Sequence, residues 1–357
     1  MLVVALGLSL AATPLGSTTS LAGPADRPNV LIFLTDDQRQ GLEVMGAVRR
    51  SIEERGRSYP NAFVTTPACC PSRASIFTGR YAHNHKVATN FDAGKIAHNT
   101  TLQFYLQRAG YRTGYIGKFL NGWKLNQGPP FFNEWAINAP DTTERKLLYY
   151  DGPVNVNGAI RQLPEYSTTF WGNKASDFIR SWDRTNDDKP WFMYVAPNAP
   201  HPPLVPEKKY ERARVGGWAG NPGTHETNRA DKPQWVRDAH SSFKKGRKTR
   251  KKQYQMLKSV NDMTRHVMRV LRRTDESKDT LVIFISDNGY SWSEHGLIGK
   301  FNPYTESVQV PLLVHWPQHV DAGDSDERLV ANIDVAPTVL EATGVTPDGP
   351  PMDGRSL

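Results

Sequence analysis

The stretch N-V-L-I-F-L-T at residues 29–35 decides the fold of this 357-residue chain. It is a continuous apolar run rich in β-branched side chains, which is typical of a strand buried on both faces of a parallel sheet. A second run of the same kind, T-L-V-I-F-I-S, occupies residues 280–286. Asp36 directly follows the first run, and Asp287 directly follows the second. The sequence therefore predicts two buried strands whose carboxyl ends carry acidic side chains.

Further strands and helices alternate between these two runs and after them. Shorter apolar runs at residues 191–196 and 310–315 predict strands, and helical patterns occupy residues 101–109, 254–271 and 336–342. Alternation of this kind is typical of an α/β fold. We therefore expect a doubly wound, mostly parallel sheet with helices on both faces.

Four oxygen-bearing side chains follow the two decisive strands: Asp36, Asp37, Asp287 and Asn288. Ligands of open α/β sheets bind beyond the carboxyl ends of the strands. Three carboxylates gathered there would repel one another unless a cation held them, and an all-oxygen set favours a hard cation, Ca²⁺ or Mg²⁺. One Asp pair after a strand would more often cap a helix beside solvent. Two such groups favour a metal site.

Residues 69–80, C-C-P-S-R-A-S-I-F-T-G-R, form the second motif. Pro71 suits the first turn of a helix, so Cys69 is expected at a helix N-terminus. There the helix dipole and free N–H groups favour a thiolate or a bound tetrahedral oxyanion, and Arg73 adds a fixed positive charge. The alternative for an isolated pair is that Cys69 and Cys70 pack as small apolar side chains.

The formal net charge of +8 first suggests a polyanionic partner. Residues 244–252, K-K-G-R-K-T-R-K-K, hold seven basic residues and no acid, so the rest of the chain is nearly neutral. A basic nucleic-acid-binding domain is not indicated, and we expect a solvated loop and helix start before residue 254. The two cysteines of the chain are adjacent, which excludes a disulfide framework.

Residues 1–25 carry no charged side chain, and an apolar stretch at residues 2–12 leads into a small-residue segment at residues 17–25. This pattern predicts a secretory signal peptide, and the apolar stretch is too short to span a bilayer. We expect a secreted or periplasmic protein without an integral membrane span. The alternative is an apolar leader on a cytoplasmic protein.

The motif at residues 69–80 resembles the sulfatase signature, in which Cys-x-Pro-Ser-Arg is followed by three variable residues and then by Leu-Thr-Gly-Arg. Phe77 in place of the Leu is the one departure. Further short motifs occur in the family's order: Asp36-Asp37, Gly117-Lys118, Ala199-Pro200-His201-Pro202, Ser286-Asp287-Asn288-Gly289, His295-Gly296, Gly299-Lys300 and Val310-Pro311-Leu312. The cysteine doublet, His83-Asn84-His85 and residues 117–122 most resemble N-acetylglucosamine-6-sulfatases and bacterial arylsulfatase-like members.

The resemblance implies an alkaline-phosphatase-like fold and a sulfuric ester hydrolase of type I. In that family a formylglycine-generating enzyme converts the first signature cysteine, here Cys69, to formylglycine, whose hydrated aldehyde is the nucleophile. The resemblance also implies that one Ca²⁺ ion is bound by residue 69 together with Asp36, Asp37, Asp287 and Asn288. The remaining catalytic positions match Arg73, Lys118, His201 and Lys300. The two lysines would bind sulfate oxygens, and the histidine would protonate or hydrogen-bond the leaving alkoxide.

Two features depart from the family pattern. Many sulfatases carry a histidine where this chain has Leu120, and His85 is the candidate that we expect to take its place. Family members usually continue past residues 353–357 into an antiparallel C-terminal subdomain, which we expect to be truncated or missing here. The expected domains are a leader at residues 1–25 and a sulfatase catalytic domain at residues 26–357.

The sequence thus predicts hydrolysis of sulfate monoesters on a small molecule or oligosaccharide, such as 6-O-sulfated N-acetylglucosamine. Two alternatives stay open. One is a phosphate-ester hydrolase of the alkaline phosphatase superfamily, although its members use Ser or Thr with two metal ions. The other is an inactive relative that binds carbohydrate or polyanions through its basic run, with no nucleic-acid partner expected.

Overall fold

The computed structural model describes residues 27–138, 145–185 and 189–357. The predicted leader at residues 1–25 lies outside these ranges. Within them, no helix combines the length and the apolar character that crossing a bilayer requires.

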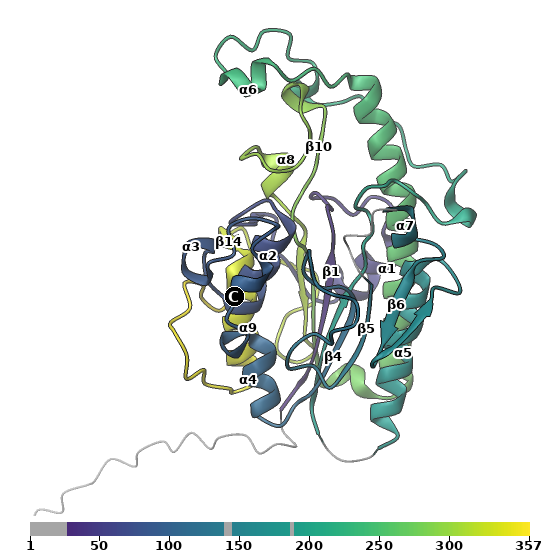
Figure 1. Cartoon of the computed structure of the whole chain (residues 1–357), viewed down its shortest axis with the longest axis vertical. Helices are drawn as coiled ribbons and strands as arrows, with labels where there is room; N and C mark the ends of the chain where they lie inside the picture. Colours follow the sequence, from purple (N-terminus) through teal and green to yellow (C-terminus); the bar gives the residue numbers. More distant parts are fainter. Residues whose placement is uncertain (1–26, 139–144, 186–188) are drawn as a thin grey trace, which may run out of the picture.

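A large mixed sheet runs through the centre of the described chain (Figure 1). Its middle five strands are parallel and lie in the order β9 (Thr280–Ser286), β1 (Asn29–Thr35), β8 (Trp191–Ala196), β4 (Arg112–Lys118) and β5 (Glu134–Asn138). The two decisive runs are direct neighbours, with Asn29 opposite Thr280 and Thr35 opposite Ser286. Every residue of β1 and β9 is buried, as their unbroken apolar sequences predict.

The sheet becomes antiparallel towards both edges. On the β9 side it continues through β12 (Leu312–His315) and β2 (Arg57–Ser58), with β13 (Asp324–Ser325) parallel to β2 at the edge. On the β5 side it continues through β6 (Pro153–Val156) and β7 (Ala159–Gln162). The expectation of a mostly parallel sheet is confirmed for its middle, and the strand expected from residue 310 begins at residue 312 and runs antiparallel.

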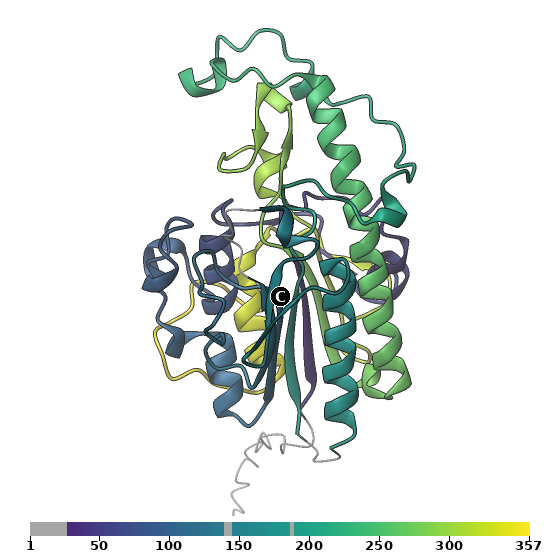
Figure 2. The same ribbon diagram turned by 45° about the vertical axis from the view of Figure 1, so that its right-hand side comes forward.

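Helices cover both faces of the sheet (Figures 1 and 2), which confirms the doubly wound architecture. Side chains of β1 alternate between the two layers: Leu31 and Phe33 pack with helices α1 (Gly46–Val48), α5 (Ser167–Asp183) and α7 (Phe243–Arg273). Val30, Ile32 and Leu34 pack on the opposite face, with helices α2 (Cys69–Thr78), α4 (Leu102–Arg108) and α9 (Val335–Ala342).

The short elements are α3 (Ala82–His85), α6 (Gln234–Arg237), α8 (Thr305–Val308), β3 (Ala62–Phe63), β14 (Val330–Ala331), β10 (Ser291–Trp292) and β11 (Ile298–Gly299). Strands β10 and β11 form a hairpin of their own. Together with α6, α8 and the first turns of α7, it projects beyond the end of the sheet at which β9 finishes (Figures 1 and 2).

Helix α7 begins eleven residues before the helix that the sequence predicts, so the loop expected over residues 244–252 is wrong. The side chain of Ser242 caps the helix by accepting a hydrogen bond from the N–H of Lys245. The inner side of these first turns is buried, and a Cβ atom at Gly246 would lie 1.8 Å from the Trp292 carbonyl oxygen. Within residues 244–252 only Gly246, Thr249 and Arg250 are buried, and none of them is a large apolar residue. The helical pattern therefore cannot be recognised from the composition of this stretch.

Candidate active site

The carboxyl ends of the parallel strands gather the predicted polar side chains. Asp36 and Asp37 directly follow β1, Asp287 directly follows β9, and Lys118 is the last residue of β4. All four are buried, with exposed fractions of 2% or less. The arrangement agrees with the rule that sites of open α/β sheets lie beyond the strand ends.

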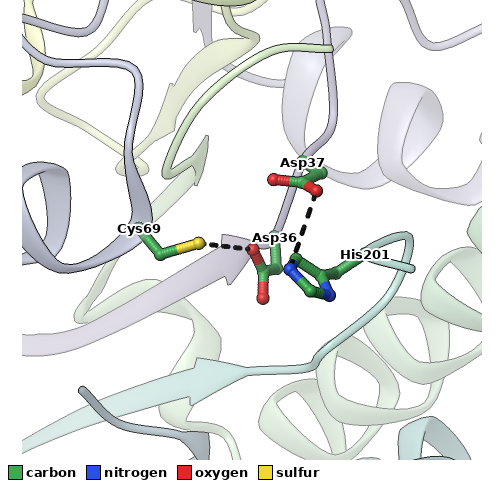
Figure 3. Close-up of side chains that lie close together, drawn as sticks. All are labelled: Asp36, Asp37, Cys69 and His201. Atoms are coloured by element: carbon green, nitrogen blue, oxygen red, sulfur yellow. Dashed lines mark hydrogen bonds and ion pairs between the residues drawn. The ribbon is translucent and has the colours of Figure 1, made fainter. Parts of the chain in front are cut away.

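Cys69 reaches this cluster from the first residue of α2 (Figure 3). Its Sγ atom lies 3.4 Å from Asp36 Oδ1 and 2.7 Å from Lys300 Nζ. Burial and the charge of Asp36 raise the pKa of the Cys69 thiol to about 12. Because the thiolate is the nucleophilic form of cysteine, the unmodified side chain is a poor nucleophile at neutral pH.

Two lysines place positive charge against the carboxylates. Lys118 Nζ lies 2.6 Å from Asp36 Oδ2, and Lys300 Nζ contacts Asp37 Oδ1. Burial acts to lower the pKa of each lysine, but the neighbouring Asp36 and Asp37 outweigh it and hold both pKa values above the ordinary range. Both ammonium groups are therefore charged near the Cys69 sulfur.

Arg73 ties α2 to two strand ends from a fully buried position. Its Nε donates to Asp287 Oδ2 at 2.9 Å, and its Nη1 donates to the Lys118 carbonyl oxygen at 2.5 Å. Burial, with the nearby charge of Asp36, raises the pKa of Asp287 to about 6. The guanidinium thus fixes the relative positions of Asp287, Lys118 and the helix that carries Cys69.

Asp37 and Asn288 each keep one buried oxygen without a hydrogen-bond partner in the described chain: Asp37 Oδ2 and Asn288 Oδ1. The neighbouring polar groups of these two residues do have hydrogen-bond partners. Asn288 Nδ2 donates to Asp37 Oδ1 at 2.7 Å, and the Asp37 N–H donates to Asp287 Oδ1 at 3.2 Å. Asp37 also adopts φ of 71°, a strained value for a residue other than glycine. Buried oxygens without partners are rare and fit a hard cation.

His201 closes the cluster from the loop after β8 (Figure 3). Its Nε2 lies 3.9 Å from Asp37 Oδ2, and its Nδ1 contacts the carbonyl oxygen of Pro202, which can only accept. Nδ1 therefore carries the proton and Nε2 faces the carboxylates. Burial lowers the pKa of His201, so the ring is neutral at neutral pH. Ligand atoms of Asp36, Asp37, Cys69 and His201 all lie within 4.8 Å of one another, close enough to hold a metal ion.

The structure does not bring His85 into this cluster. His85 Nε2 lies 3.1 Å from Ser75 Oγ, and its Nδ1 accepts from the Val87 N–H at 3.1 Å. Burial, with a smaller contribution from Arg80, lowers its pKa to about 4. The ring therefore packs against the middle of α2, and Leu120 is likewise buried in the apolar core.

Three residues that the sequence analysis missed support the cluster. Gln253 of α7 donates through Nε2 to the carbonyl oxygens of Asp37 and Pro200, at 3.4 Å each. Asn90 accepts from the Cys70 N–H at 2.9 Å, and Tyr149 donates to the carbonyl oxygen of Asn198 at 3.1 Å. None of the three belongs to a motif. Gln253 lies one residue before the helix expected at residues 254–271, so no sequence pattern marked it as a buried helical position.

Comparison with known proteins places the chain among sulfatases. The family model described as Sulfatase matches residues 28–345. N-acetylglucosamine-6-sulfatase of Homo sapiens is 32% identical over 94% of this chain and 65% of the relative. An extracellular sulfatase SULF-1 homolog of Drosophila melanogaster is 34% identical over 93% of this chain and 31% of the relative. The chain thus spans between about one third and two thirds of these relatives.

Solved structures show the same fold. A protein in complex with its substrate D-glucosamine-2-N,6-O-disulfate superposes with a TM-score of 0.74 at 23% identity, over 93% of this chain and 79% of that one. The phosphonate monoester hydrolase of Agrobacterium radiobacter superposes with a TM-score of 0.67 at 22% identity, over 93% and 76% of the two chains. The expected alkaline-phosphatase-like fold is confirmed.

Proposed function

Because this chain belongs to the sulfatase family, we propose that it hydrolyses sulfate monoesters at residue 69. The observation that carries the proposal is the position of the signature cysteine. Cys69 begins a buried helix and contacts both a carboxylate, Asp36, and a charged lysine, Lys300. A sulfate group needs cations around it, and this cluster supplies them beside the reacting position.

The Cys69 thiol itself is poorly suited to attack, because its pKa of about 12 keeps it protonated. We propose that a formylglycine-generating enzyme converts it to formylglycine, whose hydrate supplies a hydroxyl nucleophile and a second hydroxyl that allows sulfate release. Asp36 Oδ1, which contacts Sγ in the precursor, is the group that would orient the modified side chain.

A calcium ion fits the cluster through Asp36, Asp37, Asp287, Asn288 and residue 69. The support is the pair of unpartnered buried oxygens on Asp37 and Asn288, together with the all-oxygen donor set after the strands. When bound, the ion would lower the pKa of the attacking hydroxyl and offset negative charge on the sulfate.

The remaining residues have roles that follow from their contacts. Lys118 and Lys300 stay charged beside residue 69 and would bind sulfate oxygens. His201 presents Nε2 to the cluster; because this nitrogen carries no proton in the neutral ring, it would have to take up a proton before it could donate a hydrogen bond to the leaving oxygen or protonate it. Arg73 is wholly buried and bonded to Asp287, so it acts as a positioning residue.

The proposed substrate is a sulfated carbohydrate, including 6-O-sulfated N-acetylglucosamine, as a small molecule or an oligosaccharide. Support comes from relatives named N-acetylglucosamine-6-sulfatase, which match across most of this chain. Relatives named as extracellular sulfatases, together with the apolar leader, support secretion. We propose residues 26–357 as the catalytic domain.

Mass spectrometry of the tryptic peptide at residues 58–73 tests the modification. The peptide carries both cysteines, so Cys70 is an internal control for alkylation. We expect one alkylated cysteine and one aldehyde at residue 69 in protein from the native host. Two alkylated thiols there would contradict the proposal.

Activity on aryl sulfates tests the reaction, with Cys69→Ala as the inactive variant and Cys70→Ala as its matched control. We expect Cys69→Ala to abolish turnover and Cys70→Ala to retain it. Chelation should remove activity and calcium should restore it. An enzyme that hydrolysed aryl phosphates and left aryl sulfates intact would favour the phosphate-ester alternative.

A further inference from the structure

The first turns of α7 and the segment at residues 214–218 enclose a basic pocket of about 560 Å³. Six basic side chains line it, and no acidic side chain does: Arg214, Lys244, Arg247, Lys248, Arg250 and Lys251. Four of them, at positions 244, 247, 248 and 251 of α7, are three or four residues apart, which brings their side chains to one face of the helix. Along the helix axis this face extends for about 10 Å.

The outer charges of this pocket lack acidic partners in the part of the chain that the structure describes. Lys244, Lys248 and Lys251 are exposed, and no ion pair joins any of them to a carboxylate there. Some other exposed basic side chains are paired on their own helices, as Arg265 is with Asp262 at 2.7 Å. An unpaired cluster of like charges repels itself and attracts an anion.

Contacts of the buried Arg250 hold the floor of the pocket together. Arg250 is only 8% exposed, and its guanidinium carbon lies 4.1 Å from the ring centre of Tyr254 and 5.9 Å from that of Trp218. Its Nη1 donates to the Gly216 carbonyl oxygen at 3.3 Å. Arg250 therefore holds the 214–218 segment against α7 and keeps the basic side chains on both walls of one recess.

A chain of contacts joins this floor to the candidate active site. Arg250 also lies over the ring of Trp292, whose Nε1 donates to Gln253 Oε1 at 2.5 Å. Gln253 in turn bonds the carbonyl oxygen of Asp37. The basic turns of α7 also project beyond the end of the sheet where the site residues gather (Figures 1 and 2). The pocket and the site thus share one end of the molecule.

We propose that this pocket is a second anion-binding site, which holds sulfate groups of a polysulfated glycan while another sulfate of the same chain is hydrolysed. The glycan class rests on the proposed function, because the substrate must carry sulfate esters. Single-stranded nucleic acid would also require exposed rings for base stacking. The one aromatic residue of the lining, Trp218, instead packs against Phe243 and Trp292.

Binding to heparin, as a polysulfated glycan probe, tests the pocket in the full chain. The test variant is Lys244→Gln/Lys248→Gln/Lys251→Gln. The matched control, Arg269→Gln/Arg272→Gln/Arg273→Gln, removes three exposed charges at the other end of α7. For the test variant we expect at least about tenfold weaker heparin binding near 0.1 M salt, and a slope of log K against log salt reduced by about two. The control should keep nearly wild-type values.

Kinetics separate a binding role from damage to the site. Turnover of a small aryl sulfate should be unchanged in both kcat and KM, whereas KM for a sulfated oligosaccharide should rise several-fold with kcat unchanged. Equal heparin binding by the two triple variants would overturn the proposal. So would single-stranded DNA that bound as tightly as heparin and was equally weakened by the test variant.

Heparin binding needs no catalysis, so this test is independent of the proposed reaction. Cys69→Ala should bind heparin like the wild type. Loss of binding in the test triple variant, together with absence of sulfatase activity in the wild type, would reject the proposed function and leave the anion site supported.

Discussion

Lys118 and Lys251 lie towards the same end of the molecule, but their charges are balanced in different ways. Lys118 is 2% exposed and lies 2.6 Å from an Asp36 oxygen, so its charge is balanced inside the protein. Lys251 is exposed and has no acidic partner in the described chain, so its charge is balanced by solvent. Burying an unpaired charge costs far more than exposing one. Charges of the active site are therefore bound into the fold, and those of the basic pocket remain available to a ligand.

Breaking a buried pair should have the largest effect. Arg73→Ala removes the partner of Asp287 and leaves a buried carboxylate uncompensated, which costs about 3–5 kcal/mol of unfolding free energy. Lys251→Ala on the exposed face should change stability by less than about 0.5 kcal/mol. Urea unfolding of both variants measures the contrast. A similar small loss in both would show that the buried network is not held by its ion pairs.

Metal removal should have the next largest effect, and it acts on the buried cluster alone. A ligand that binds only the folded state at about 100 times its Kd stabilises it by about 2.7 kcal/mol. We expect calcium to raise the melting temperature of chelated protein, and Asn288→Ala to lose most of that increase because it removes an unpartnered oxygen. Asn84→Ala, at an exposed position, is the control. A full calcium response in Asn288→Ala would remove this residue from the proposed ligands.

The sequence predicted the buried strands and the residues at their ends, because both depend on short-range patterns. An apolar β-branched run that stops at Asp36 can be identified without knowing what lies beside it. The neighbouring run at residues 280–286 converges on it because parallel strands bring their carboxyl ends to one edge. Cys69, Lys118, His201 and Lys300 were found through a motif, and the fold brings them together.

The contacts that depend on distant parts of the chain could not be predicted in this way. Nearness to the signature in sequence suggested His85, but its ring packs against Ser75 of α2. Gln253 is remote from every motif and reaches Asp37 only because α7 extends beyond the sheet. The basic run was expected to form a loop because its buried positions, such as Gly246, are small or polar.

His85 provides a test of burial without a charge partner. Its pKa is lowered to about 4, so below an unfolded value of about 6.5 the unfolded chain binds a proton that the folded chain does not. Stability should therefore fall as the pH drops from about 6.5 towards 4, by roughly 1 kcal/mol per pH unit from this group.

The pH test compares urea midpoints at pH 7 and pH 5. The difference between the two should be smaller in His85→Gln than in the wild type. His83→Gln, at an exposed position two residues away, should retain the wild-type difference. Identical pH dependence in His85→Gln and the wild type would show that the His85 ring is protonated as easily in the folded protein as in the unfolded chain.

The smallest effect concerns the exposed charges and has the opposite sign. Lys248 lies four residues from both Lys244 and Lys252, and like charges at this spacing cost about 0.2–0.5 kcal/mol per pair. Lys248→Glu turns both pairs into attractive ones near a helix N-terminus, so it should stabilise the fold by about 0.5–1 kcal/mol at low salt. Urea midpoints at low and high salt measure this gain, which should vanish near 1 M salt. The same substitution should weaken heparin binding, because self-repulsion on this face is the cost of a surface that attracts polyanions. A loss of stability at low salt would instead mean that Lys248 stabilises the folded chain as it stands.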